Sequence, residues 1–360
     1  MIVFKSDRIW GPKGFVSGYV VAMEQYKITG ITPVKPSWFS GEYYDFTDKI
    51  IVPGFVDVHT HGAGGHPFSG TADDMVQACD FHLAHGTTTV LPTVSTYSEE
   101  TVRRSARNVA EVMRSRRTKG RVAGIHLEGP YISKSRCGGS AGETPAGADA
   151  YVRLANEYGG VIRRWTFAPE CDPDGEFCRF VTSRGIVASA GHTNGTAEQL
   201  KKSIGSGCRL VTHLYSCTSS VKVNGGRCAA GIAEGALLYD VAVEAVADGR
   251  RLSPELLMLI YKTKGADGMI LCTDSLPCTG TERAGETAFS GSAATADGAL
   301  RFAVSCGIPL WDAVKMLTRT PADLMRIDAG RIEPGYPIDL AVLDEGLNVT
   351  DVFFGGKKVV

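Results

Sequence analysis

Histidine and acidic residues end several short apolar runs of this sequence. The residues that share this position are His59, His61, Glu128, His192, His213 and Asp274. Imidazole and carboxylate groups are the ligands that Zn²⁺, Fe²⁺ and similar ions take in proteins. A single histidine at the end of an apolar run is more often a hydrogen-bonded structural residue than a ligand. Five such run ends on one rim of a fold are hard to explain as packing, and together they indicate metal-assisted chemistry.

Eight strand-like runs carry or accompany these residues, and helical stretches lie between many of them. The runs are Gly54–His61, Thr87–Thr93, Arg121–Gly129, Val161–Glu170, Gly185–His192, Arg209–Tyr215, Asp240–Asp248 and Gly268–Asp274. The expected helices include Ser98–Arg116, Thr196–Ser203 and Pro254–Lys264. This alternation predicts an α/β fold, a (β/α)8 TIM-type barrel. Because residues i and i+2 of a strand point to one face, His59 and His61 can reach the same ion.

Both ends of the chain have a different texture, in which short apolar runs alternate with turn signals. The strand candidates there are Ile2–Phe4, Gly18–Met23, Tyr26–Ile31, Lys49–Val52, Asp339–Leu343 and Val349–Phe354. We therefore expect a small β unit that flanks the barrel and is assembled from both ends of the chain.

The composition is that of a globular protein, with 43% hydrophobic and 21% charged residues in a chain of 360. A formal net charge of −1 gives no sign of a nucleic-acid partner or an acidic membrane surface. The 10 cysteines form no CxxC pair, which argues against a disulfide framework. The opening MIVFKSDRIWGPKG does not resemble a signal peptide, and no run approaches the roughly 20 apolar residues of a membrane span. We expect a cytoplasmic protein with reduced thiols.

Six segments, in order along the chain, resemble the N-acetylglucosamine-6-phosphate deacetylase family of the amidohydrolase superfamily. They read PGFVDVHTHGAGG, HLEGPYI, GHTN, THLY, TDS and GRIEPGYPIDLAVLD. The first and the last are shared across the superfamily, whereas the HLEGP segment and the GHTN, THLY and TD series are specific to this family. The resemblance implies a catalytic barrel over residues 53–330 and a small β-sandwich domain built from residues 1–52 and 331–360. It also implies a homodimer, because the family is usually dimeric.

The resemblance implies a role for each residue at a strand end. The implied ligands of a main metal ion are Glu128, His192 and His213. The implied catalytic carboxylate is Asp274. Family members that keep the HxH pair can hold a second ion, so His59 and His61 imply either a second ion bridged by Glu128 or a hydrogen-bonded pair beside a single ion. One or two divalent ions of the Zn or Fe type are therefore expected per subunit.

The implied reaction removes the N-acetyl group of an amino-sugar 6-phosphate, turning N-acetylglucosamine 6-phosphate into glucosamine 6-phosphate and acetate. The residues expected to bind this small-molecule substrate are Arg227, Arg251, Ser216, Cys217 and Gly139. The sequence departs from the family here: Ser216 and Cys217 replace an Asn-Ala pair, and Arg251 replaces a histidine. The segment around Gly139 also lacks a family histidine. Three alternatives stay open: another hexosamine phosphate such as N-acetylgalactosamine 6-phosphate, another amidohydrolase-type amide hydrolysis, and a non-catalytic binding module.

Overall fold

A computed structural model describes the chain from residue 1 to 360 except for residues 23–26, 34–39, 96–97, 134–135, 137–147 and 284–290. Within the described ranges, eight parallel strands follow one another around a barrel, and each lies at one of the eight predicted runs. They are β6 (Phe55–Thr60), β9 (Thr87–Ser95), β11 (Ile125–Glu128), β12 (Ile162–Phe167), β13 (Val187–Ala190), β14 (Leu210–Val211), β17 (Ala242–Val246) and β18 (Met269–Cys272). The predicted barrel is confirmed.

The barrel closes where its last strand returns to its first. The backbone N–H of Asp274 donates to the carbonyl of His59 at 2.8 Å, and the N–H of His61 donates to the carbonyl of Ser275 at 2.7 Å. A short strand, β10 (Arg121–Val122), pairs with β9 just before β11 begins. Closure therefore joins the residues that follow β18 to those at the end of β6, which brings two of the predicted site segments side by side.

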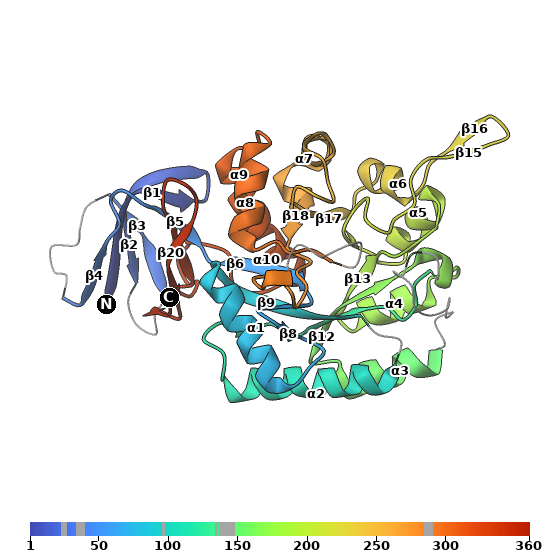
Figure 1. The fold of residues 1–360 in the computed structure, drawn as a ribbon, viewed down its shortest axis with the longest axis horizontal. Coiled ribbons are helices and arrows are strands. Elements are labelled where there is room, and N and C mark those ends of the chain that lie inside the picture. The colour runs from blue at the N-terminus through green and yellow to red at the C-terminus, as the bar shows by residue number, and fades with distance from the viewer. Residues whose placement is uncertain (23–26, 34–39, 96–97, 134–135, 137–147, 284–290) are drawn as a thin grey trace.

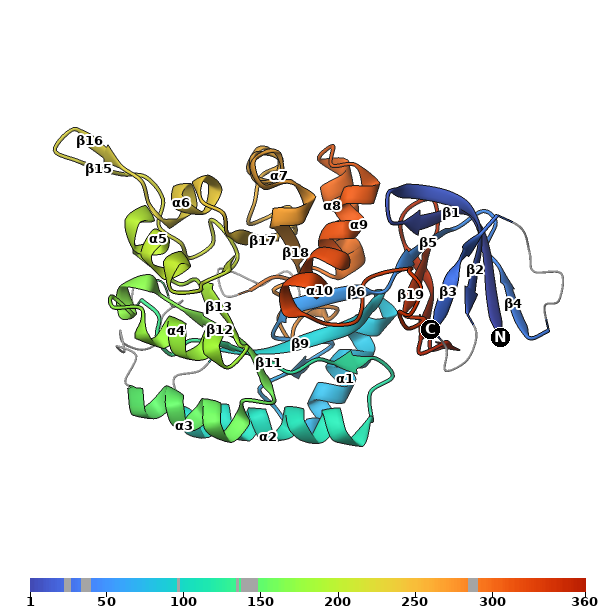
Figure 2. The same ribbon diagram turned by 180° about the vertical axis from the view of Figure 1, so that it is seen from behind.

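Helices surround the barrel, with α2 and α3 on one side and α7 and α9 on the other (Figures 1 and 2). They are α1 (Ala72–Ala84), α2 (Glu99–Ser115), α3 (Ala148–Tyr158), α4 (Glu176–Ser183), α5 (Ala197–Gly205), α6 (Ile232–Leu238), α7 (Pro254–Gly268), α8 (Ala296–Ser305), α9 (Leu310–Leu317) and α10 (Arg319–Met325). Ser98 and Ser253 cap α2 and α7 through their side chains. The helical backbone of α7 is interrupted at Gly265, where φ is 64°.

The two termini share a second, mixed sheet at one end of the molecule (Figure 1). In the part of the chain that the structure describes, its strands are β1 (Ile2–Gly11), β2 (Gly14–Ala22), β3 (Ile28–Thr32), β4 (Glu42–Asp45), β5 (Ile50–Pro53), β19 (Leu340–Leu343), β20 (Val349–Phe354) and β21 (Lys357–Lys358). β5 runs antiparallel to β19, with Ile51 opposite Val342. Phe4, Ile51 and Phe353 pack in one buried cluster, so strands from both termini enclose a common core. The small β unit built from both chain ends is confirmed.

Two tryptophans hold this sheet against the barrel. The rings of Trp10 in β1 and Trp311 in α9 stack with centroids 5.4 Å apart. Each indole N–H donates to a backbone carbonyl of the other segment at 3.0 Å: Trp10 to Trp311 and Trp311 to Gly11. The terminal sheet thus supports the side of the barrel and supplies none of the six predicted strand-end residues.

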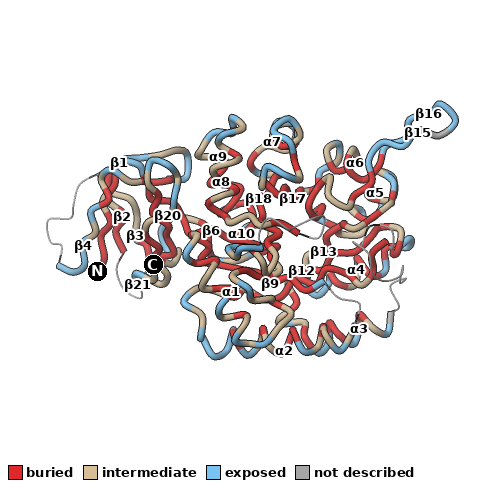
Figure 3. The backbone as a smooth tube through the Cα atoms, viewed as in Figure 1, coloured by how far each residue is buried: buried red, intermediate tan, exposed pale blue. Residues whose placement is uncertain are grey.

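The barrel interior is buried, and one segment stands well outside it (Figure 3). The hairpin of β15 (Lys222–Asn224) and β16 (Arg227–Ala229) projects away from the barrel at the end opposite the terminal sheet. A shorter pair, β7 (Gly62–Ala63) with β8 (His66–Pro67), follows β6 on the rim. Among the described helices, none is both long and apolar enough to cross a membrane. The nine described cysteines are all free thiols.

Candidate metal centre

The six strand-end residues meet at the carboxyl-terminal mouth of the barrel. Three groups of potential metal ligands occur among the described residues, and two of them consist only of these side chains, the third being His59 with Glu244 and Cys272. The first is His59, His61 and Asp274, and the second is Glu128, His192 and His213; within each group the ligand atoms all lie within 4.8 Å of one another. Active sites of such barrels lie at this face because the strand ends converge there. The structure therefore brings together every residue that the sequence predicted for the metal and the catalytic acid.

Glu128 lies between the two groups. Its Oε1 atom is 2.9 Å from His192 Nε2 and 3.2 Å from His213 Nε2. The same oxygen is 3.4 Å from His59 Nε2, and Oε2 is 3.5 Å from His61 Nε2. The hydroxyl of Ser95, at the end of β9, donates to Oε2. A carboxylate in this position can supply one oxygen to each of two ions.

Asp274 faces the histidine pair of the first strand. Its Oδ1 atom lies 3.2 Å from His61 Nε2 and 3.4 Å from His59 Nε2. Burial raises the pKa of Asp274, but the two neighbouring imidazoles lower it by more, so the net pKa lies below the usual carboxyl value. Asp274 is therefore a carboxylate, able to accept a proton beside the candidate ligands.

The electrostatics of the cluster favour a cation. Burial lowers the pKa of His59, but Glu128, Glu244 and Asp274 raise it by more, to about 10. Burial raises the pKa of Glu128, yet the imidazoles beside it bring that pKa well below its usual value. The negative charge that favours a proton on His59 also favours a metal ion. Among the described residues, His59 Nε2 is buried and has no hydrogen-bond partner, although it faces two carboxylates. An imidazole nitrogen of this kind fits a metal ligand.

Several residues at the strand ends have strained backbone, which the surrounding contacts hold in place. Of the eight described non-glycine residues with positive φ, five lie at this mouth: His192, His213, Tyr215, Cys217 and Asp274. Such a conformation costs about 1–3 kcal/mol per residue and persists only where surrounding contacts determine it. Strained residues of this type gather at functional sites. Here they turn three of the candidate side chains toward the centre of the barrel mouth.

A second layer of polar residues lies beneath the cluster, and the sequence reasoning missed it. Arg164 of β12 and Glu244 of β17 are fully buried inside the barrel and form an ion pair. Burial raises the pKa of Glu244, but Arg164 and His59 lower it by more, to about 2. Asp57 accepts a hydrogen bond from the backbone N–H of His59 at 3.2 Å. The available signal was a charged residue in the middle of an otherwise apolar strand, as Glu244 is in Ala242–Val246.

The residues expected to bind substrate do not all lie beside the cluster. Arg251 reaches the cluster: its Nε lies 3.9 Å from Asp274 Oδ2, and its Nη1 bonds Asp248 Oδ2 at 2.7 Å. Among the described residues, Arg251 Nη2 is buried and has no hydrogen-bond partner. Cys217 lies beside the cluster, where its carbonyl accepts from the N–H of Thr193 at 3.0 Å.

The other three predicted substrate residues differ in position. Ser216 follows the sixth strand, and its N–H donates to the carbonyl of His213 at 2.8 Å. Arg227 is exposed on the β15–β16 hairpin, which projects away from its own barrel (Figures 1 and 3). Gly139 lies outside the described residues. Of the two arginines predicted to bind substrate, Arg251 lies against the cluster of its own chain and Arg227 does not.

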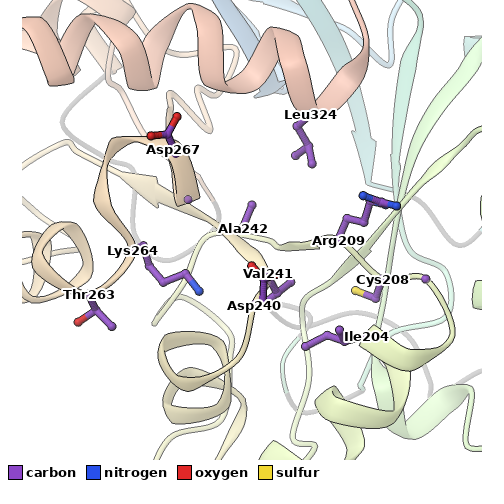
Figure 4. A pocket seen from close by; sticks show the side chains of 12 residues that line it. Ile204, Cys208, Arg209, Asp240, Val241, Ala242, Thr263, Lys264, Asp267 and Leu324 are labelled. Carbon is purple, nitrogen blue, oxygen red and sulfur yellow. The ribbon is translucent and has the colours of Figure 1, made fainter.

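A pocket at the opposite end of the barrel contrasts with this mouth (Figure 4). It is lined where strands begin, by Arg209 before β14, Ala242 of β17 and Gly268 before β18. Lys264 Nζ donates to two backbone carbonyls at the end of α6, at 3.0 and 2.8 Å. Asp267 pairs with a lysine of α9. Because these two charged groups already have structural partners, they do not form a site of the kind seen at the mouth.

Known proteins resemble the chain over almost its whole length. The amidohydrolase family matches residues 50–359. N-acetylglucosamine-6-phosphate deacetylase of Bacillus subtilis is 30% identical over 293 residues, covering 78% of this chain and 72% of that protein. N-acetylgalactosamine-6-phosphate deacetylase of a Shewanella species is 29% identical, covering 88% of this chain and 84% of that protein. A mutant N-acetyl-D-glucosamine-6-phosphate deacetylase from Mycobacterium smegmatis, solved in complex with N-acetyl-D-glucosamine-6-phosphate, has a TM-score of 0.89 at 28% identity and covers 100% of this chain and 99% of that one.

Proposed function

Because the chain belongs to the amidohydrolase family, we propose that it hydrolyses the N-acetyl group of an amino-sugar 6-phosphate. The proposed substrate is N-acetylglucosamine 6-phosphate, and the products are glucosamine 6-phosphate and acetate. The observation that carries the proposal is the meeting of six metal-ligand and acid–base side chains at one barrel mouth. The deacetylases that resemble this chain over most of its length support it.

The proposed ligands of the main divalent ion, of the Zn or Fe type, are Glu128, His192 and His213. His59 and His61 are the proposed ligands of a second ion, with Glu128 shared between the two. An ion bound in such a site polarises an amide carbonyl and lowers the pKa of a bound water. The donor set supports this assignment because imidazole and carboxylate suit both metals.

Asp274 is the proposed acid–base residue of the reaction. Its carboxylate accepts a proton from the attacking water and later passes it to the nitrogen of the leaving amine. Oδ1 faces the histidine pair, whereas Oδ2 lies toward Arg251. One oxygen of the Asp274 carboxylate thus faces the proposed ion site, and the other faces the proposed substrate side. Burial of Asp274 keeps bulk water away from this proton transfer.

We propose that Arg251, Ser216, Cys217 and Gly139 contribute to the substrate side of the site. The support for Arg251 is its buried Nη2, which has no partner among the described residues and lies beside the reacting carboxylate. A guanidinium can bind phosphate or hydroxyl oxygens of a sugar. Arg227 is part of the same proposal through a homodimer: its hairpin projects from its own barrel, so it would reach a phosphate only in a second copy of the chain.

A second candidate substrate is N-acetylgalactosamine 6-phosphate. The observation that favours it is the similarity to a deacetylase of that sugar at 29% identity. The departures at Ser216, Cys217 and Arg251 fall on the substrate side, where epimers are told apart. We propose that either reaction takes place in the cytoplasm, and the free thiols of all nine described cysteines support this proposal.

A panel of substrates tests the proposal. Purified protein supplemented with Zn²⁺ or Fe²⁺ is given the 6-phosphates of N-acetylglucosamine, N-acetylgalactosamine and N-acetylmannosamine, together with the unphosphorylated sugars, and acetate release is measured. We expect one hexosamine 6-phosphate to be hydrolysed far faster than its unphosphorylated form. Bound metal without acetate release from any sugar would contradict the substrate assignment. No metal binding at any supplement would favour a binding module.

A further inference from the structure

A charged pair lies beneath the proposed ion sites, in the interior of the barrel. The side chains of Arg164 and Glu244 are both fully buried, with no exposed surface. Both carboxylate oxygens of Glu244 accept from the guanidinium: Nη1 donates to Oε1, and Nη2 donates to Oε2 at 2.9 Å. A two-pronged contact of this kind fixes the carboxylate in direction as well as in position.

Arg164 is itself held from several strands. Its Nη1 donates to the carbonyl of Val58 in β6 at 3.1 Å. Its Nη2 donates to Ser189 Oγ in β13 at 3.2 Å and to Thr212 Oγ1, just after β14, at 2.9 Å. The guanidinium therefore spans the barrel interior, and Glu244 cannot shift without breaking contacts to several strands.

Glu244 in turn bonds two of the proposed ligands. Its Oε2 accepts from His59 Nδ1 at 3.1 Å and from the backbone N–H of His213 at 3.3 Å. In a neutral imidazole, as a metal ligand must be, a hydrogen on Nδ1 leaves the lone pair on Nε2. His59 Nε2 is buried and has no hydrogen-bond partner among the described residues, and it lies 3.4 Å from Glu128 Oε1 and from Asp274 Oδ1.

We propose that the Arg164–Glu244 pair is a positioning device that selects the tautomer of His59 and aims its Nε2 as a ligand of a second metal ion. This inference rests on the proposed function for the existence of that ion. Metal-bound histidines commonly donate their other ring nitrogen to a carboxylate, which fixes the ring and strengthens the ligand. Glu244 is a positioning residue, since it contacts the ligand and not the substrate.

Packing alone is a poor account of the pair. Barrel interiors are ordinarily filled by branched apolar side chains. A buried ion pair is often no more stabilising than apolar residues of the same volume, because two charges must be desolvated. The geometry supplies a reason for the charged residues at this depth, since an apolar residue in place of Glu244 could not accept the hydrogen of His59 Nδ1.

Metal titration of Glu244→Gln tests the inference. Ions per subunit are measured by elemental analysis after equilibration with buffers of defined free Zn²⁺, in wild-type protein and in the variant. The wild type is expected to bind two ions. The variant is expected to keep the first ion, which is held by Glu128, His192 and His213, and to bind the second roughly 10- to 100-fold more weakly.

Two further variants make the result interpretable. Cys272→Ala removes the thiol that forms a further candidate ligand group with His59 and Glu244, but it leaves the hydrogen bond between those two residues. This variant is expected to keep two ions, and loss of the second ion would overturn the inference because the thiol would then be its ligand. If Glu244→Gln fails to fold because Arg164 is left unpaired, the double variant Arg164→Met with Glu244→Leu removes both charges. That protein is expected to fold and to bind one ion tightly.

The outcomes separate this inference from the proposed function. A wild type that binds no metal overturns the proposed function, and the inference falls with it. A wild type that binds only one ion overturns the inference and leaves a single-ion deacetylase standing. Two ions held with unchanged affinity in the folded Glu244 variants also overturn the inference alone, because the ligand would not need its positioning partner.

Discussion

The strand-end cluster and the rim around it differ in how firmly the fold determines them. In the cluster, six side chains from five strand ends converge, and Glu128 contacts four histidines within 3.5 Å. On the rim, Arg251 lies against the cluster, whereas Arg227 stands on an exposed hairpin. The barrel places the cluster because His59 and Glu128 lie on its strands and the other four residues follow a strand end by one or two positions. Loops place the rim, and loops tolerate change.

From this difference we propose that the reaction type and the choice of substrate depend on residues at separate places in the chain. The residues of the cluster match the family pattern, and the structure assembles them. Ser216, Cys217 and Arg251 depart from that pattern and lie in the segments that follow β14 and β17. We therefore expect changes in the cluster to abolish turnover on every substrate, and changes on the rim to alter the choice among substrates.

Removal of metal is expected to have the largest effect on activity, and the effect should be the same for every substrate. After dialysis against a chelator, acetate release should fall to the background rate for every sugar in the panel, because all substrates share the cluster. Addition of Zn²⁺ or Fe²⁺ should restore it. Full activity in protein shown by elemental analysis to be metal-free would contradict the metal assignment.

Replacement of the proposed acid–base residue comes next. Asp274→Asn should lower kcat by roughly 10²- to 10⁴-fold, since the amide cannot accept the proton from water. Equilibrium metal content should stay close to that of the wild type if Asp274 acts mainly on the proton. Near-normal turnover by this variant would show that another group performs the proton transfer.

A change on the substrate side should have a smaller and more selective effect. Arg251→Met should lower kcat/KM about 10- to 100-fold, the range expected for loss of one hydrogen bond to a charged group, while metal content is unchanged. Arg250→Met is the matched control, because the neighbouring side chain is exposed, and it should stay within about twofold of the wild type. An equal fall in kcat/KM in both variants would contradict a substrate-binding role for Arg251.

The smallest expected effect is that of Asp74→Asn, which should lower the free energy of unfolding without changing turnover. Hydrogen bonds from His66 and Thr71 lower the pKa of Asp74, at the start of α1, to about 2. A carboxyl with a lowered pKa stabilises the fold above its unfolded pKa near 4 and loses that contribution as the pH falls toward 2. Asp74→Asn should reduce the free energy of unfolding by about 0.5–2 kcal/mol at pH 7, the range of a helix cap, as measured by urea denaturation.

The pH dependence of that difference is the check on its cause. The gap between wild type and Asp74→Asn should shrink toward zero between about pH 4 and pH 2. A gap that stays constant over this range would mean that the substitution acts through packing and not through the charge of Asp74.

Much of the barrel could be predicted from local sequence, because each strand is a short apolar run with a polar residue at its end. The capped helices were equally visible, as Ser98 and Ser253 show. The terminal sheet was harder. β1 extends from Ile2 to Gly11, well past the predicted end at Phe4. The longer strand was not predicted because the polar and charged residues 5–8 interrupt its apolar run. β4, Glu42–Asp45, was not predicted at all, since its charged residues and tyrosines carry no apolar run.

The cluster could be predicted in part, and its supporting layer could not. Strand-end histidines are visible one motif at a time, but the bond between Glu244 and Arg164 joins residues 80 positions apart. Only the closed barrel brings them together. The position of Arg227 could not be predicted either, because the local sequence indicates a turn but not the direction in which the hairpin points.

We propose above all that the strand-end cluster binds divalent metal. Anomalous diffraction at the zinc edge, from crystals grown with Zn²⁺, tests it most directly. We expect a peak within roughly 2.0–2.2 Å of the Glu128, His192 and His213 ligand atoms, and a second beside His59 and His61. Peaks confined to other parts of the molecule, with the cluster side chains bonded only to one another, would contradict it.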